Sequence, residues 1–129
     1  MNRPALFLVL CLIACDGSGQ PEVTLPADMT LKTGEQRLIK GLTVTFVGVE
    51  EDSRCPDNAR CVWAGNAAVN LRIQGGADSV SITLNSGVEP RAIGVQDLRF
   101  TIVSLLPAPV VGAPVPASHD LTLRVESTR

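Results

Sequence analysis

The sequence predicts an all-β fold, a small antiparallel β-sandwich of about seven strands. From residue 22 to residue 129, short apolar or alternating runs are separated by turn residues, and none keeps helical spacing for longer than a turn or two. Aromatic residues are scarce, with one Trp, three Phe and no Tyr, so Val, Leu and Ile must build the core. This composition favours strands, and seven short strands are typical of a sandwich or a barrel.

The expected strands cover residues 28–32, 36–40, 42–50, 66–74, 79–85, 97–105 and 120–126. Four of them show an apolar face, which identifies the side chains that each strand turns toward the core. These side chains are Leu42, Val44 and Phe46; Ala67, Val69, Leu71 and Ile73; Val80, Ile82 and Leu84; and Leu121, Leu123 and Val125. Residues 75–78, Gly-Gly-Ala-Asp, predict a hairpin turn, and the four prolines in residues 107–116 predict a surface loop.

The first 14 residues have the three parts of a secretory signal peptide. Arg3 gives the positive start, an uncharged apolar run extends from Ala5, and the small residue Ala14 precedes the expected cleavage. The run is too short to span a bilayer, which takes roughly 20 apolar residues. Residues 15–21 predict a flexible tether, followed by one domain over residues 22–129.

The end of the signal, Leu12-Ile13-Ala14-Cys15, resembles the lipobox of bacterial lipoproteins. This resemblance implies that Cys15 becomes the first residue, carries acyl chains such as palmitate, and anchors the protein to a membrane. Each buried CH₂ of such chains contributes about 0.8 kcal/mol, so several chains hold a protein in place. The chain is then expected in the cell envelope, facing the periplasm or the exterior. Asp16 resembles an inner-membrane retention signal whose rule varies between lineages, so the inner and outer membranes both stay open.

Two of the four cysteines are left to pair with each other. Cys11 leaves with the signal peptide and Cys15 takes the lipid, which leaves Cys55 and Cys61 in an oxidising compartment. We therefore expect a Cys55–Cys61 disulfide that closes a short loop.

The segment over residues 50–67 departs from the generic pattern of strands and turns. It contains Asp52-Ser53-Arg54-Cys55-Pro56, and then Cys61, a hydrophobic residue, Trp63, Ala64 and Gly65. This pattern resembles a signature of small exported proteins and lipoproteins of several bacterial phyla. The family has no assigned activity, so the resemblance implies a fold and a compartment only.

A structural role accounts for each residue of this segment. Pro56 helps the loop turn, and Gly65 permits the bend from the loop into the next strand. Arg54 can form a charge-assisted hydrogen bond to Asp52 or to turn carbonyls. We expect the ring of Trp63 to pack over the disulfide and the end of the sandwich.

Three functional alternatives for the same segment stay open. Calcium could bind the oxygen ligands of the acid-rich loop 50–58, namely Glu50, Glu51, Asp52, Asp57 and Asn58, although their spacing matches no EF-hand. A soft metal on Cys55, Cys61 and His119 would need reduced thiols. The disulfide-closed loop could also present Arg54 or Arg60 to a trypsin-like protease as an inhibitor.

Charge and motifs exclude other classes. The formal charge is −2, and loss of the signal peptide removes Arg3 but no acidic residue, which argues against nucleic-acid binding. We expect His119, the one histidine, to lie on the surface beside Asp120, and no catalytic motif surrounds it. The sequence therefore predicts a module without a cofactor or catalysis that binds or supports other envelope components. Its expected partners are the membrane, through the lipid, and an envelope protein.

Overall fold

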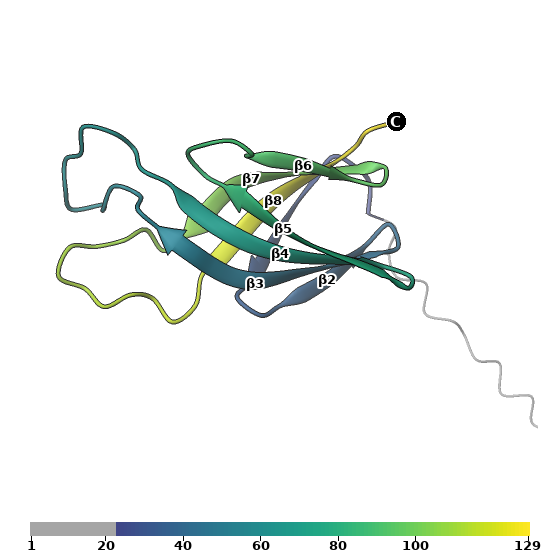
Figure 1. Ribbon diagram of the computed structural model, residues 1–129, viewed down its shortest axis with the longest axis horizontal. Helices are drawn as coiled ribbons and strands as arrows, with labels where there is room; N and C mark the ends of the chain where they lie inside the picture. The colour runs from purple at the N-terminus through teal and green to yellow at the C-terminus, as the bar shows by residue number, and fades with distance from the viewer. Residues whose placement is uncertain (1–22) are drawn as a thin grey trace, which may run out of the picture.

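Eight strands form two antiparallel sheets of four strands each, as Figure 1 shows for a computed structural model that describes residues 23–129. The first sheet has the order β1-β8-β7-β6 and the second has the order β2-β3-β4-β5. The strands are β1 Ala27–Lys32, β2 Gln36–Ile39, β3 Leu42–Asp52, β4 Ala67–Gly75, β5 Asp78–Asn85, β6 Ala92–Val95, β7 Leu98–Leu106 and β8 Asp120–Ser127. The predicted all-β sandwich is confirmed, while the predicted signal peptide (1–14) and tether (15–21) lie outside the described residues.

The core lies between the two sheets and uses the faces that alternation predicts. Every predicted core side chain of β3, β4 and β8 is buried. In β5 only Leu84 is fully buried, whereas Ile82 is partly buried and Val80 is exposed. The reason is that β5 is an edge strand, so its outer side lacks a neighbouring strand to cover it.

The eighth strand, β6, was not predicted from the sequence. It has four residues and forms a hairpin with β7, in which Val95 pairs with Leu98. The connecting residues are Gln96 and Asp97, and Gln96 has a positive φ of 53°. The sequence shows no Gly or Asn at this turn, so the usual hairpin signal is missing.

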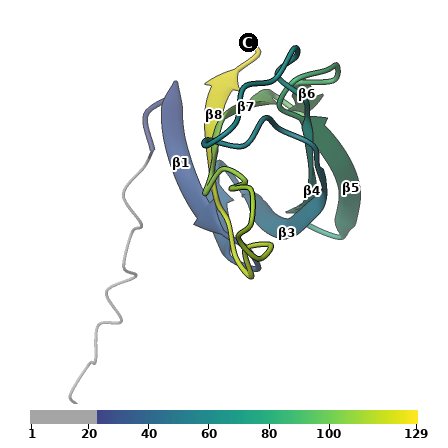
Figure 2. The same ribbon diagram turned by 90° about the vertical axis from the view of Figure 1, so that its left-hand side faces the viewer.

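The sandwich has two distinct ends, which we call the base and the tip. The base comprises residues 23–25, the turn at Lys40, the turn at Gln96 and Asp97, and Arg129. The tip comprises the long loops 53–66 and 107–119, which lie side by side in Figures 1 and 2. Because β3 has eleven residues that rise about 3.3 Å each, roughly 33 Å separate its ends at base and tip. No helix that could cross a membrane occurs among residues 23–129.

Candidate functional site: the two loops of the tip

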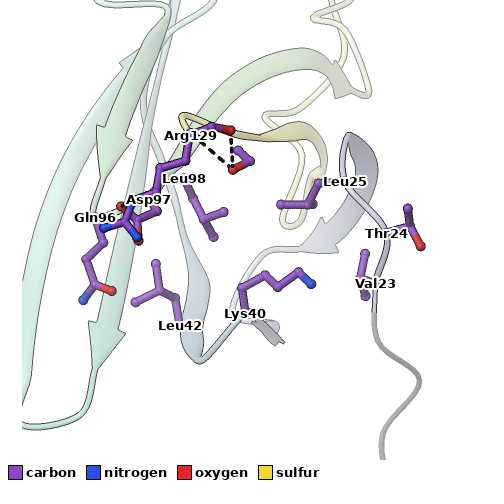
Figure 3. A pocket seen from close by; sticks show the side chains of 10 residues that line it. Val23, Thr24, Leu25, Lys40, Leu42, Gln96, Asp97, Leu98 and Arg129 are labelled. Carbon is purple, nitrogen blue, oxygen red and sulfur yellow. Dashed lines mark hydrogen bonds and ion pairs between the residues drawn. The ribbon is translucent and has the colours of Figure 1, made fainter.

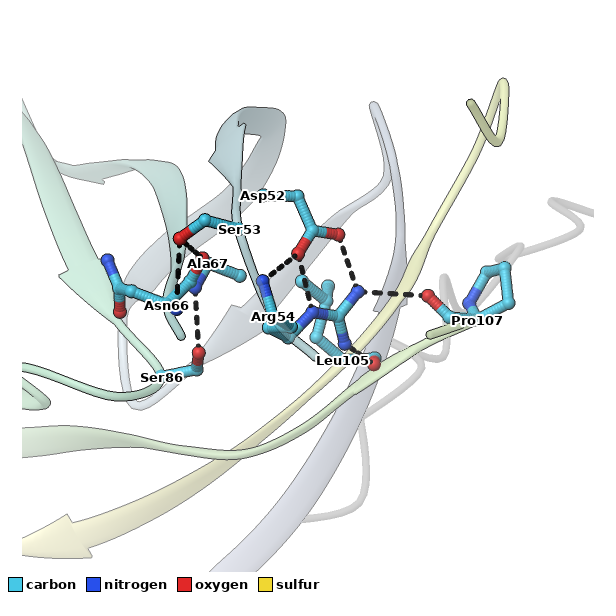
Figure 4. A network of polar contacts seen from close by, with 8 residues as sticks. All are labelled: Asp52, Ser53, Arg54, Asn66, Ala67, Ser86, Leu105 and Pro107. Carbon is cyan, nitrogen blue, oxygen red and sulfur yellow. Dashed lines mark hydrogen bonds and ion pairs between the residues drawn. The ribbon is translucent and has the colours of Figure 1, made fainter. Parts of the chain in front are cut away.

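Arg54 joins the first tip loop to the strands beneath it (Figure 4). Its Nε and Nη2 donate to the two carboxylate oxygens of Asp52, at 2.8 and 2.7 Å. Its Nη1 donates to the carbonyl of Leu105 at 2.5 Å, and Nη2 also donates to the carbonyl of Pro107 at 3.0 Å. The expected charge-assisted hydrogen bonds are present, and they connect the end of β3 to the end of β7.

The same contacts set the ionisation of Asp52. Burial raises the pKa of this carboxyl, but hydrogen bonds from the Arg54 side chain and backbone N–H, together with the Arg54 charge, outweigh it. The net result is a pKa below the ordinary value for an aspartate. Asp52 is therefore an ionised partner that Arg54 already occupies.

Further hydrogen bonds bind the two tip loops to each other. The backbone N–H of Asp57 donates to the carbonyl of Pro109 at 3.0 Å. The side-chain amide of Asn58 donates to the carbonyl of Val111 at 3.2 Å and accepts from its N–H at 2.8 Å. Sequence reasoning offered Asn58 only as a calcium ligand, because nothing in the sequence pairs residues that lie 53 positions apart.

The disulfide constrains the first loop from within. Cys55 and Cys61 are bonded with their Cα atoms 5.8 Å apart, so the expected disulfide is present. The loop turns where Ala59 N–H donates to the Pro56 carbonyl at 3.1 Å, and Cys55 N–H donates to the Ala64 carbonyl at 3.0 Å. The first loop is therefore closed by one covalent bond and by a hydrogen-bonded turn.

The loop returns to the sheet through a close backbone contact between its two ends. Ser53 N–H donates to the Asn66 carbonyl at 2.7 Å, and Asn66 N–H donates to the Ser53 hydroxyl at 3.1 Å (Figure 4). Ser86 accepts a hydrogen bond from the next N–H, that of Ala67, at 2.8 Å. Gly65 has a φ of +70°, and a Cβ there would overlap the Ser53 carbonyl. Glycine is therefore required at position 65 both for its conformation and for lack of space.

Trp63 does not pack over the disulfide, which corrects the expectation from sequence. Its side chain is 77% exposed, and the neighbouring Val62 is 94% exposed. Arg54 and the carbonyls that it binds occupy the junction between loop and sandwich, and the loop extends beyond that junction. Valines of the second loop are also exposed, so the tip presents five large apolar side chains to solvent: Val62, Trp63, Val110, Val111 and Val115.

His119 is buried, which corrects the expectation of a surface histidine. It is 7% exposed, because it precedes β8 where Asp120 pairs with Lys32 at the end of β1. Its backbone N–H donates to the Thr33 hydroxyl at 3.0 Å. The imidazole Nε2 is buried and has no hydrogen-bond partner among residues 23–129.

A cavity of about 360 Å³ opens beside His119. It is lined by the end of β3, by Thr33 after β1 and by the second tip loop; the lining residues are Thr33, Gly48, Val49, Glu50, Glu51, Asp52, Val115, Pro116, Ala117 and His119. The cavity therefore combines carboxylates, an unpaired buried imidazole nitrogen and apolar walls.

A second cavity, of about 510 Å³, lies at the base (Figure 3). Leu25, Leu42 and Leu98 give it an apolar floor. Arg129 at its rim forms an ion pair with Asp97, with Nε 2.9 Å from Oδ1. The side chains of Val23 and Thr24 stand at the same end in Figure 3, so this cavity lies where the described chain begins.

No family model, curated protein or solved structure matches the chain. The contacts of the tip and of the two cavities are therefore the observations that bear on its function.

The geometry weighs against parts of the metal and inhibitor alternatives. Cys55 and Cys61 are bonded to each other, so they cannot act as the thiolate ligands of a soft metal. Both oxygens of Asp52 are taken by Arg54, and within residues 23–129 no three His, Cys, Asp or Glu side chains gather as a ligand set. The Arg54 side chain is only 15% exposed and held on several sides, which leaves Arg60 as the exposed arginine of the loop.

Proposed function

We propose that the chain is a lipid-anchored protein of a bacterial cell envelope, and that it is a non-catalytic module that binds a protein partner through its tip. Cys15 would carry the lipid, as its resemblance to a lipobox cysteine implies. The tip, formed by two loops bound to each other, would supply the recognition surface.

The observation that carries this proposal is the group of exposed apolar side chains on two interlocked loops. Single exposed hydrophobic residues are ordinary on protein surfaces, but a group of them marks an interaction site. Here Val62 and Trp63 project from one loop and Val111 and Val115 from the other. Tryptophan is enriched among residues that dominate binding energy. Loops fixed before binding also lose less conformational entropy when a partner arrives.

The position of the anchor supports the same proposal. The described chain begins at Val23 at the base, and the eight residues 15–22 can span at most about 29 Å between it and the membrane. The tip lies at the other end of the sandwich, a distance of the order of the length of β3. A lipid on Cys15 would therefore hold the base toward the membrane and turn the tip away from it.

Site-specific photo-crosslinking in the native host tests this proposal. A photoreactive amino acid replaces Trp63 in one strain and Val115 in another, and Val80 of edge strand β5 provides the matched exposed apolar control. We expect positions 63 and 115 to capture the same envelope protein, which position 80 does not capture. Excess unlabelled chain should suppress the adduct, whereas excess chain with Trp63→Ser and Val115→Ser should not. Adducts of equal yield at all three positions, or none at 63 and 115, would contradict the proposal.

A further inference from the structure

We propose that the cavity beside His119 receives an arginine side chain of the protein partner. This inference rests on the proposed function, because it names the chemistry of the part of the partner that meets the edge of the tip. Three features of the cavity favour a guanidinium group: uncompensated carboxylates, an unpaired buried nitrogen, and apolar walls.

The negative charge that is free to bind a ligand comes from Glu50 and Glu51. Both side chains are exposed and line the cavity. Within residues 23–129 neither carboxylate has a hydrogen bond or an ion pair, whereas Asp52 has Arg54 on both oxygens. A guanidinium group offers planar, paired N–H donors that match carboxylates.

The second, independent observation is the unpaired nitrogen of His119. Most of the imidazole is buried, and Nε2 lacks a partner, which is rare for buried polar atoms in folded proteins. In the neutral tautomer protonated at Nδ1, Nε2 accepts a hydrogen bond. Arginine carries five N–H donors and no acceptor, so it could satisfy Nε2 together with the neighbouring carboxylates.

The walls of the cavity suit the aliphatic part of such a side chain. Val49, Val115 and Pro116 line it, and a methylene stem packs on surfaces of this kind while its charged head stays near polar groups. Val115 also belongs to the exposed apolar group of the tip, so a partner on the tip would reach the cavity without a gap. A calcium ion is less well matched, because it takes six to eight oxygen ligands and only two unoccupied carboxylates are present.

The binding test uses the full exported chain in detergent micelles, observed by heteronuclear NMR. The probe is Nα-acetyl-arginine amide, and its neutral analogue Nα-acetyl-citrulline amide is the control. We expect saturable shifts confined to Val49, Glu50, Glu51 and the backbone and ring of His119 with the arginine probe, and none with citrulline. Equal shifts with citrulline would overturn the inference, as would saturation by calcium chloride alone with no response to arginine.

Variants then assign the binding to the cavity. Glu50→Gln combined with Glu51→Gln should weaken binding of the arginine probe at least tenfold. The matched control, Asp78→Asn with Glu126→Gln, removes two charges that do not line the cavity and should leave binding within twofold. His119→Phe should also weaken binding while its urea midpoint stays at or above that of the unmodified chain, which shows that the fold is intact. Binding unchanged in the Glu50→Gln, Glu51→Gln variant would overturn the inference.

The two proposals fail in different ways. If position 63 captures a partner but the arginine probe gives no saturable shifts, only the cavity inference is wrong. If the probe binds and no partner is captured, the cavity exists as described but the proposed function of the tip is wrong.

Discussion

Arg54 is the residue on which the order of the tip depends most. One guanidinium group binds a carboxylate of its own loop and two carbonyls that lie 51 and 53 residues away. Hydrogen bonds that involve a charged group are stronger than neutral ones, and this ion pair is largely shielded, with side chains of Arg54 and Asp52 that are 15% and 21% exposed.

Replacing Arg54 should therefore destabilise the protein. We expect Arg54→Ala to lower the free energy of unfolding by about 2–3 kcal/mol, because Asp52 and two carbonyls lose their donors together. The matched control is Arg37→Ala, whose pair with Glu35 is 50% and 41% exposed and should cost less than about 1 kcal/mol. Urea denaturation of both variants measures the difference, and equal losses would show that Arg54 is no more than a surface arginine.

The conformation of Gly65 leads to a second prediction. Gly65→Ala combines a left-handed backbone with overlap of the new Cβ and the Ser53 carbonyl, so we expect a loss of about 2–4 kcal/mol. Gly112→Ala has a similar φ of +84° but no atom within 4 Å of the new Cβ, so it should cost only about 1–2 kcal/mol. Thermal melting of the two variants separates backbone strain from overlap. A smaller loss at Gly65 than at Gly112 would contradict the close contact.

Asp52 should make stability depend on pH. Burial raises the pKa of its carboxyl, but hydrogen bonds from Arg54 hold it below the ordinary value of 3.8. A lowered pKa stabilises the folded state at pH values above the ordinary pKa, and that contribution is lost as the pH falls through the folded pKa. We expect Asp52→Asn to flatten the decline in the free energy of unfolding below about pH 4, whereas Asp78→Asn leaves it unchanged. Identical slopes in all three proteins would show that Asp52 is not held ionised.

At the same scale, sequence anticipated some side chains of the tip and not others. The bond from Arg54 to Asp52 could be predicted because the two residues are close in the chain and opposite in charge. The positions of Trp63 and His119 could not, because a loop has no periodicity that tells which way a side chain points. His119 is buried by its neighbours at the ends of β1 and β8, which only the fold brings together.

At the scale of elements, most strands follow directly from alternation of apolar and polar residues. In β8, Leu121, Leu123 and Val125 are fully buried, as their spacing predicts. β6 could not be found in this way, because four residues that are only half-buried and include Gly94 show no alternation. The pairing of the two tip loops was also out of reach, since it depends on contacts between Asn58 and Val111 that no local pattern encodes.

The disulfide loop is an element whose contribution can be measured separately. Closing seven residues restricts the unfolded chain, so we expect Cys55→Ser with Cys61→Ser to cost about 2 kcal/mol. The sandwich core should stay intact, because it is formed by residues of the strands and none of the loop. Chemical denaturation gives the cost, and near-ultraviolet circular dichroism reports on Trp63. Complete unfolding of the double variant would show that the loop is part of the folding core.

At the scale of the whole molecule, the account describes a sandwich with a base that begins at Val23 and a tip roughly 33 Å away along β3. Anchoring and binding would then occupy opposite ends of one rigid body. This separation lets the tip meet a partner while a lipid on Cys15 holds the base near the membrane. Both the anchor and the disulfide require that the chain leave the cytoplasm.

Intact-mass spectrometry of the protein purified from its host membrane tests that requirement most directly. Samples are alkylated before and after reduction, so that each free thiol is counted. We expect a chain that begins at Cys15 with acyl chains attached, and with Cys55 and Cys61 alkylated only after reduction. A mass that retains residues 1–14, with both loop cysteines alkylated without reduction, would contradict the account.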